Sequence, residues 1–153
     1  MTTIGPRTPE QRRRDTLGRL ERDVDAWVAT AGSGGGEPYL TPLSFLWDGE
    51  TLLLATAATT PTARNLLAGG GIRLGLGEPR DVVLIEGTVA ATPDTEIPGG
   101  VGDTFAAKTG FDPRREADAY TYFRVAPRRI LAWREADELA GRELMRGGVW
   151  VVG

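Results

Sequence analysis

The sequence predicts a mainly β domain with helical additions (α+β), in which antiparallel strands form a barrel or a sandwich. About six short runs of apolar and β-branched residues are separated by turns rich in glycine and proline, and only two or three segments have helical patterning. The connections are also short, as at Asp48-Gly49, whereas parallel strands need crossovers of about a dozen residues. A doubly wound parallel sheet is therefore disfavoured.

The first element is a helix that begins with a capping signal. Thr8 precedes Pro9, a residue type that suits the first helical position, and Gln11 is placed to complete a capping box. The helix is expected over about residues 9–22. Three arginines, at positions 12–14, point in different directions around such a helix, and we expect them to be solvent-exposed. The inward-facing apolar residues are expected to be Leu17, Leu20 and Val24.

Strands and short helices follow along the rest of the chain. Helices are expected at residues 63–68 and 103–109, the second ended by Gly110, and helical composition returns over residues 135–145. Proline and glycine predict a loop over residues 92–102. Strands are expected at residues 27–30, 39–47, 51–57, 72–76, 81–89, 120–125, 129–133 and 149–152. The 153 residues favour a single domain, 1–153, with a C-terminal extension over about 135–153.

Composition removes several classes of function. The chain has 18 basic and 21 acidic residues, a formal net charge of −3, and this balance favours neither nucleic acid nor an anionic membrane as a partner. Cysteine and histidine are both absent, which excludes thiolate and Ser-His-Asp nucleophiles and the usual zinc ligand sets, so no metal site is expected. Residues 1–6 lack the regions of a signal peptide, and we expect a cytoplasmic protein.

One corner of the sequence, residues 59–71, has two interpretations. Thr60 or Thr62 can simply cap the helix at 63–68, with glycines ending it. Arg64, however, falls in the first turn of that helix, where a cation opposes the helix dipole at a cost of about 0.3–1 kcal/mol. A bound anion would offset that repulsion, and the residues alone leave both interpretations open.

For the other candidate residues, a structural role is more common than a catalytic one. Tyr39 or Tyr120 could act as a catalytic acid or base, but a tyrosine in a strand more often packs in the core. Lys108 could form a Schiff base, but nothing in the sequence indicates a lowered pKa. The four tryptophans are expected mainly in the core and in subunit contacts. We assign no catalytic residue from the sequence.

Three motifs in order resemble the pyridoxamine 5′-phosphate oxidase-like, flavin-binding split-barrel family. These are Pro-x-Ser-Phe-Leu-Trp-Asp-Gly at residues 42–49, Thr-x-x-x-x-Arg-Asn-Leu at 59–66 and Asp-Val-Val-Leu-Ile-Glu-Gly at 81–87. The actinobacterial branches that use flavin mononucleotide (FMN) or 8-hydroxy-5-deazaflavin (coenzyme F-420) are the most similar. The resemblance covers residues 25–89 well and continues more weakly to 134. It implies an antiparallel split β-barrel of the FMN-binding type.

The resemblance also implies a cofactor site, a reaction and an assembly. Asn65 would brace the turn. Thr60, Thr62 and Arg64 would bind the cofactor phosphate. The flat ring system would lie against Thr41, Pro42, Leu43, Ala55 and Thr56. Family members are homodimers, and Trp133 and Arg134 would reach across to the partner's cofactor. The expected activity is hydride transfer between the bound cofactor and a small organic substrate.

Two departures from the family pattern keep a second hypothesis open. Many relatives have lysine where this chain has Thr62, and the absence of histidine removes part of the set that grips pyridoxamine phosphate. The chain is accordingly expected to be either a flavin- or deazaflavin-dependent oxidoreductase or a non-catalytic flavin-binding or cofactor-sensing protein. In either case we expect a homodimer, because apolar strands such as residues 52–54 and 82–85 are hard for one chain to cover on both faces.

Overall fold

The computed structural model describes residues 5–152; residues 1–4, which carry most of the segment considered for a signal peptide, and residue 153 lie outside that range. The helices are α1 (Pro9–Arg22), α2 (Pro61–Leu67) and α3 (Gly99–Thr109), with 3-10 turns at Pro113–Arg115 and Ala136–Glu138. The strands are β1 (Asp25–Thr30), β2 (Tyr39–Trp47), β3 (Leu52–Ala57), β4 (Ile72–Leu76), β5 (Val82–Pro93), β6 (Tyr120–Trp133), β7 (Glu143–Arg146) and β8 (Val149–Trp150).

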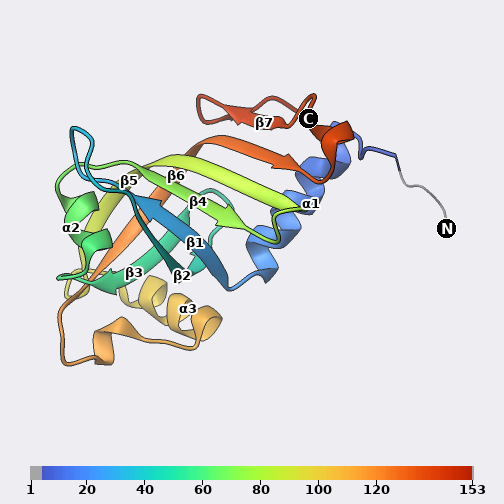
Figure 1. Cartoon of the computed structure of the whole chain (residues 1–153). Helices are drawn as coiled ribbons and strands as arrows, with labels where there is room; N and C mark the ends of the chain where they lie inside the picture. Colours follow the sequence, from blue (N-terminus) through green and yellow to red (C-terminus); the bar gives the residue numbers. More distant parts are fainter. Residues whose placement is uncertain (1–4, 153) are drawn as a thin grey trace.

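Six of the strands form a closed antiparallel barrel. Their order is β3-β2-β1-β4-β5-β6, and pairing of β3 with β6 closes the ring, while β7 and β8 extend the sheet beyond β6 (Figure 1). This arrangement confirms the mainly β, α+β class and the antiparallel split barrel. Strand alternation directs one face of each strand inward, as in β4, where Ile72, Leu74 and Leu76 are each 1% exposed. Burial of each such side chain stabilises the fold by about 1.5–3 kcal/mol.

Two neighbouring strands of the barrel separate before they end. β2 and β3 pair only where Phe45–Trp47 meet Leu52–Leu54, next to the tight turn at Asp48-Gly49. Beyond this short ladder, β2 pairs only with β1 and β3 pairs only with β6. The barrel is therefore split between β2 and β3.

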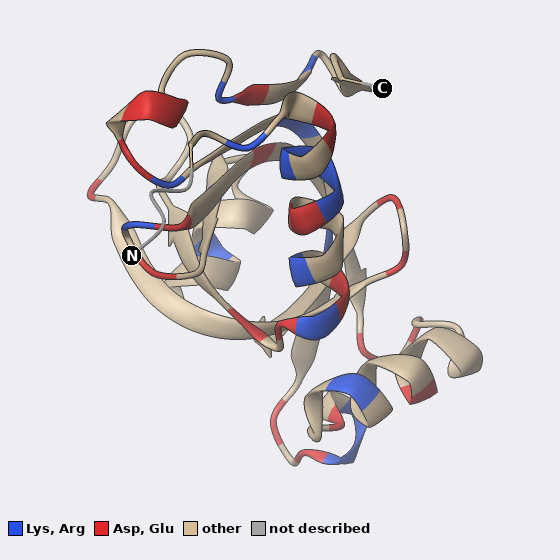
Figure 2. Cartoon of the chain, turned by 90° about the vertical axis from the view of Figure 1, so that its right-hand side faces the viewer, with Lys and Arg blue, Asp and Glu red and all other residues tan. Residues whose placement is uncertain are grey.

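The helices occupy different sides of the barrel. α1 lies at one end, where Leu20 enters the core with no exposed surface, and α2 lies near the other end (Figure 1). α3 packs against β2 and, with the 3-10 turn that follows it, stands out from the barrel as an arm (Figure 2). Among residues 5–152, no helix combines the length and the apolar character needed to cross a bilayer.

The α1 prediction is confirmed in its bounds and wrong in three details. Thr8 caps the helix by accepting a hydrogen bond from the Gln11 amide nitrogen, but the Gln11 side chain bonds Asp15 and Arg14 instead of completing the capping box. Arg12 is not exposed: its guanidinium lies buried and donates to the carbonyl oxygens of Ala132, Glu138 and Gly141. Val24 lies outside the helix and is exposed.

Long-range pairing corrects the elements expected in the second half of the chain. β6 is one strand, not two, because the register shift opposite Glu86 and Gly87 accommodates the segment around Pro127. Gly87 makes this possible, since a Cβ there would lie 2.6 Å from the carbonyl oxygen of Ala126. The predicted loop at 92–102 is confirmed only for residues 94–98, because residues 92–93 end β5 and residues 99–102 begin α3.

The expected helix over 135–145 is also wrong. Only the 3-10 turn at Ala136–Glu138 forms, and Gly141, with a φ of 72°, takes a left-handed conformation that redirects the chain into β7. β7 then pairs with β6. Sheet extension and the burial of Glu138 therefore override the local helix propensity.

Candidate functional site

A cleft with a volume of about 450 Å³ opens where β2 and β3 separate. This size falls in the range of small-molecule sites, and the mouth of a barrel is a common place for them. Residues from β1, β2, β3, β6, α3 and the adjoining loops line it: Asp25, Pro42, Leu43, Ser44, Ala55, Thr56, Ala57, Thr60, Phe105, Thr109, Phe111 and Tyr120.

Two strand edges face this cleft. Pro42–Ser44 of β2 are hydrogen-bonded to β1 on one side, and Ala55–Ala57 of β3 are hydrogen-bonded to β6 on one side. In the part of the chain that the structure describes, neither segment has a strand partner on its other side. Backbone N–H and C=O groups left in this way need hydrogen-bonding partners. The cleft therefore offers donors and acceptors along two edges, a geometry suited to a flat ring with polar atoms at its rim.

A pair of hydroxyl groups lies where the cleft meets α2. The hydroxyls of Thr56 and Thr60 are 3.0 Å apart and hydrogen-bonded to each other. Thr60 is also the N-cap, and its Oγ1 accepts a hydrogen bond from the Ala63 amide nitrogen at 3.2 Å. Pro61 at the first helical position explains why the helix starts there. Of the two caps left open by the sequence, the structure selects Thr60.

Arg64 sits deeper in α2 than expected. Because the helix starts at Pro61, Arg64 is its fourth residue, and its backbone N–H already bonds the Thr60 carbonyl oxygen at 3.0 Å. The predicted conflict with the helix dipole in the first turn is therefore wrong. The side chain is exposed, does not line the cleft and has no hydrogen-bonding or ion-pair partner within residues 5–152.

The remaining corner residues are mainly structural in this chain. Asn65 braces the turn, since its Nδ2 donates to Thr30 Oγ1 in β1 at 3.1 Å. Thr62 is 1% exposed, and its hydroxyl has no hydrogen-bonding partner among the described residues. Thr41 pairs with Val28 within the sheet and is half-buried, and it is not among the residues that line the cleft.

The arm supplies a wall that the sequence reasoning did not assign. Phe105, Thr109 and Phe111, from α3 and the residues just after it, line the cleft opposite the strands. The Phe111 ring packs against the Tyr120 ring with centroids 5.6 Å apart. The sequence offered only two phenylalanines, Phe105 and Phe111, on either side of the end of a predicted helix. Their positions do not indicate which strands they will face.

Two further residues at the mouth were also missed. Ser44 donates a hydrogen bond to Asp25 across the paired strands, with 2.6 Å between Oγ and Oδ1. Ser44 belongs to the first of the three family motifs, which was the signal available for it. The titratable side chains that line the cleft are therefore Asp25 and Tyr120.

Two predicted residues lie away from the cleft of their own chain. Trp133 ends β6, the strand that begins beside the cleft at Tyr120, and it contacts the Arg142 guanidinium at 5.7 Å. Arg134 forms ion pairs with Asp81 at 3.4 Å and Asp15 at 3.9 Å. The structure thus gathers Pro42, Leu43, Ala55, Thr56 and Thr60 at the cleft, keeps Thr62, Arg64 and Asn65 on the adjoining helix, and separates Trp133 and Arg134 from both.

The environment of Lys108 differs from the expectation. Burial lowers the pKa of its ammonium group, which lies 4.9 Å from the centre of the Phe45 ring and 3.4 Å from the Phe45 carbonyl oxygen. Packing against Phe45 thus removes water from the ammonium group, which the sequence did not indicate. Lys108 does not line the cleft, however, and we give it no role there.

The comparison with known families gives a direct result. The family described as "Pyridoxamine 5'-phosphate oxidase" matches residues 19–134, which include all six barrel strands, β1 to β6. The chain therefore belongs to the pyridoxamine 5′-phosphate oxidase-like split-barrel family. A search of curated proteins found no match to the sequence.

Solved structures agree on the fold. An F420 reductase is 22% identical over 74% of this chain and 93% of its own, with a TM-score of 0.60. A putative pyridoxamine 5′-phosphate oxidase from Listeria innocua is 16% identical over 80% of this chain and 98% of its own, with a TM-score of 0.62. HutZ, a heme storage protein from Vibrio cholerae, is 14% identical over 79% of this chain and 94% of its own, with a TM-score of 0.63. At these identities, the likeness establishes the fold alone.

Proposed function

We propose that the protein is an oxidoreductase that uses a flavin-type cofactor, either FMN or 8-hydroxy-5-deazaflavin, bound in the cleft between β2 and β3. The observation that carries this proposal is the two strand edges, Pro42–Ser44 and Ala55–Ala57, each paired on one side only, that face an open cleft of about 450 Å³. Membership of the family supports it.

The residues of the cleft fit such a group. The flat ring would lie against Pro42, Leu43 and Ala55, with its polar rim bonded to the backbone of the two edges. The phosphate would be placed near the hydroxyls of Thr56 and Thr60, with Arg64 turning its unpaired guanidinium toward it. The bound cofactor would supply hydride transfer, and the protein would supply binding, orientation and exclusion of water.

The arm would shape the substrate side of the cleft. Phe105 and Phe111 present apolar surface, and Asp25 and Tyr120 are the titratable groups available beside it. A small organic substrate would bind between this wall and the cofactor ring. Because few protein groups can transfer protons here, the reaction would depend mainly on the cofactor's own chemistry.

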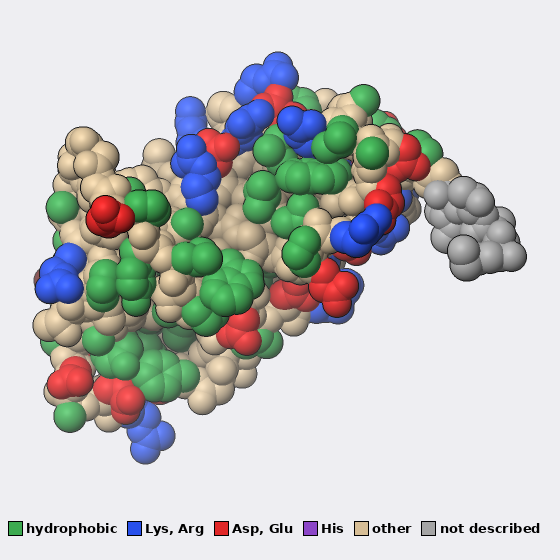
Figure 3. Space-filling model, viewed as in Figure 1, with side chains coloured by type: hydrophobic (Ala, Val, Ile, Leu, Met, Phe, Trp, Pro, Cys, Tyr) green, Lys and Arg blue, Asp and Glu red, His purple; other side chains and the backbone are tan. Residues whose placement is uncertain are grey.

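We also propose that the protein is a two-fold homodimer. The sequence argument for a dimer rested on the apolar segments 52–54 and 82–85, but most of their residues are buried within one chain and need no partner to cover them. The outer face of the barrel gives a better argument for a dimer. Four residues there are direct neighbours across β1, β4, β5 and β6: Trp27, Gly75, Leu84 and Leu131. Trp27 is 54% exposed and Leu84 37%, and hydrophobic side chains gather on the face that these strands present (Figure 3).

A dimer through this face would place the partner beside the cleft. Pro42, which lines the cleft, is the neighbour of Trp27 in β2, so the apolar row ends at the mouth of the site. Trp133 and Arg134 could contact the cofactor only in the partner's cleft, since neither lies at the cleft of its own chain.

The test of the proposed function is a spectroscopic titration followed by a reduction assay. Purified protein is titrated with FMN and, separately, with 8-hydroxy-5-deazaflavin, and the change in cofactor absorbance and fluorescence is recorded. We expect saturable binding of one cofactor at a stoichiometry of one per chain. Substrate-dependent oxidation of the reduced, bound cofactor would then establish catalysis. Absence of saturable binding for both cofactors would refute the proposal.

A second candidate is non-catalytic binding of a flavin-type cofactor, for storage or sensing. It is favoured by the small number of titratable groups at the cleft and by the lack of a cation among its lining residues. Saturable cofactor binding without turnover of any offered electron acceptor would favour this alternative.

A further inference from the structure

The opposite end of the barrel carries a second hollow, of about 310 Å³, along the exposed side of α1. Five arginines line it: Arg7, Arg14, Arg19, Arg22 and Arg134. Figure 2 shows basic and acidic residues interspersed along α1, which faces the viewer at this end. The hollow shares no lining residue with the cleft between β2 and β3.

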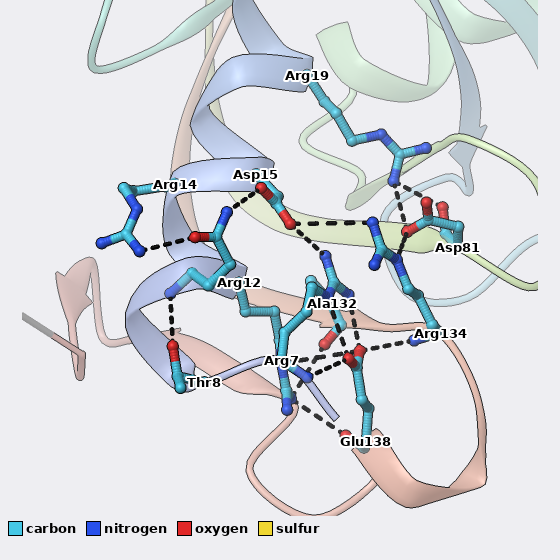
Figure 4. A network of polar contacts seen from close by, with 11 residues as sticks. Arg7, Thr8, Arg12, Arg14, Asp15, Arg19, Asp81, Ala132, Arg134 and Glu138 are labelled. Atoms are coloured by element: carbon cyan, nitrogen blue, oxygen red, sulfur yellow. Dashed lines mark hydrogen bonds and ion pairs between the residues drawn. The ribbon is translucent and has the colours of Figure 1, made fainter. Parts of the chain in front are cut away.

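Three aspartates in the hollow are already engaged by arginines, and Figure 4 shows two of them, Asp15 and Asp81. Asp81 contacts Arg19 at 3.3 Å and Arg134 at 3.4 Å. Asp15 contacts Arg7 at 3.2 Å and Arg134 at 3.9 Å. Asp23 contacts Arg19 at 3.9 Å. These contacts hold the guanidinium groups of Arg7, Arg19 and Arg134 in place and neutralise the three carboxylates of the hollow.

Two arginines at the rim have no carboxylate partner within residues 5–152. Arg14 donates only to the amide oxygen of Gln11, at 2.7 Å, and Arg22 has no hydrogen bond or ion pair. With five guanidinium groups and three carboxylates, the lining has a formal excess of two positive charges. The hollow is thus a preformed, electropositive site in a protein whose overall formal charge is −3.

Gly18 leaves room for one of the rim arginines. Arg14, Gly18 and Arg22 are spaced four residues apart and lie on one face of α1. Helical side chains point toward the N-terminus, so Arg22 folds back over Gly18, while Arg14 reaches toward Gln11. A Cβ at position 18 would lie 2.9 Å from Nη1 of Arg22, so a larger residue would displace this guanidinium. Glycine inside a helix is otherwise unfavourable, and here it makes room for a cation at the rim of the hollow.

We propose that this hollow binds a phosphate group, either free or as part of a small phosphorylated molecule, at the rim that Arg14 and Arg22 line. A phosphate dianion matches the excess charge, and guanidinium groups bind phosphate through paired hydrogen bonds. Its small volume and the negative charge of the rest of the chain favour a small anion over a nucleic acid. The proposal is independent of the cofactor cleft.

The test is an NMR titration of the whole protein with inorganic phosphate at constant ionic strength, made up with chloride. We expect saturable shifts of α1 resonances, including the side-chain Nε–H signals of Arg14 and Arg22. Arg14→Gln and Arg22→Gln should each raise the dissociation constant about tenfold. Both side chains are exposed, so the variants should remain folded.

A matched variant separates this site from other exposed arginines. Arg115→Gln removes an exposed arginine with no ion pair within the described residues, and it should leave the phosphate dissociation constant unchanged. Gly18→Ala should weaken binding while raising the midpoint of thermal unfolding, because alanine favours the helix. The proposal is overturned if Arg115→Gln weakens binding as much as Arg22→Gln, or if α1 resonances do not shift.

Discussion

At the scale of single residues, Arg64 and Glu138 illustrate how charged side chains take different roles in this chain. Arg64 is exposed and unpaired within residues 5–152, at the helix beside the cleft. Glu138 is 2% exposed and accepts hydrogen bonds from the Arg7 side chain and from the backbone nitrogens of Arg7 and Arg134. The first is available for a ligand, and the second ties the chain's N-terminal part to the segment after β6.

We expect Arg64→Ala to weaken cofactor binding without affecting the fold. Loss of a charge-assisted contact to phosphate should reduce affinity by about 1.5–3 kcal/mol, or roughly ten- to a hundredfold. The free energy of unfolding should change by less than about 0.5 kcal/mol, because the side chain is exposed. Fluorescence titration with FMN and the deazaflavin measures the first quantity, and urea unfolding measures the second. Unchanged affinity, equal to that of Arg115→Ala, would remove Arg64 from the site.

The converse substitution, Thr62→Lys, is less informative than the sequence suggested. Thr62 is 1% exposed, so a lysine would have to leave the space between α2 and the barrel. Any gain in phosphate affinity would then be mixed with the loss of packing. Arg64 is therefore the more informative residue to change.

Glu138 should make stability depend on acid pH. The side-chain hydrogen bonds from Arg7 lower its pKa to about 2, although burial opposes this shift. Since the folded-state pKa lies below the unfolded one, its contribution is complete above the unfolded value of about 4.3 and disappears as the pH falls toward 2. Glu138→Gln should destabilise the protein by about 3–5 kcal/mol at pH 7, because Arg7 and Arg12 remain buried.

Urea unfolding of wild type and Glu138→Gln between pH 7 and pH 2 checks this expectation. The difference in the free energy of unfolding should be constant above about pH 5 and shrink below it. Glu116→Gln, an exposed carboxylate with no side-chain partner within the described residues, is the control and should show no such trend. A difference that does not vary with pH would contradict the assignment.

At the scale of elements, the long strand β6 depends on a close approach to β5. The register shift between Glu86 and Gly87 allows the two strands to remain paired from Val82 to Pro93. Gly87 is at the closest point, where a Cβ would lie 2.6 Å from the Ala126 oxygen and 2.7 Å from Val125 Cγ1. One of these contacts is with backbone, so it cannot be relieved by a change of rotamer.

Gly87→Ala should accordingly destabilise the barrel by about 1–3 kcal/mol, the usual range for overpacking. Thermal or urea unfolding provides the measurement. Gly100→Ala is the matched change, because a Cβ at that position of α3 meets nothing within 4 Å, and it should leave stability equal or slightly increased. Equal stability of the two variants would show that the strands can separate at this point without loss.

At the scale of the whole molecule, the outer apolar row and the split between β2 and β3 lie next to each other. Pro42 belongs to both, since it lines the cleft and neighbours Trp27 across the sheet. Assembly through this face would therefore affect access to the cleft. A stable interface should bury more than about 1,200 Å².

We expect light scattering to detect a dimer at micromolar concentration. Trp27→Glu should shift the protein toward a monomer, because a carboxylate would replace a large apolar side chain of the row that is 54% exposed. Val149→Glu, which changes an exposed apolar residue on β8, should leave the dimer intact. A wild-type monomer, or equal dissociation by both variants, would contradict the proposed interface.

The sequence by itself determined the class of fold and most strand positions. β2 and β4 have the predicted bounds, and the α1 bounds also agree, because alternation of apolar residues and a Thr-Pro capping signal are local properties. The order of three short motifs indicated the family, and the corner at residues 59–66 indicated the cleft to which Thr60 contributes.

Only the tertiary structure decided the features that depend on distant partners. Pairing with β5 made β6 a single strand, and the ion pair with Arg7 buried Glu138 where a helix was expected. The arm that carries Phe105 reached the cleft through packing against β2, which no local pattern encodes. Arg12 was expected to be exposed and is buried, because its partners are carbonyl groups more than a hundred residues away along the chain. Such contacts are decided by how the barrel closes, whereas capping and alternation are decided within a few residues.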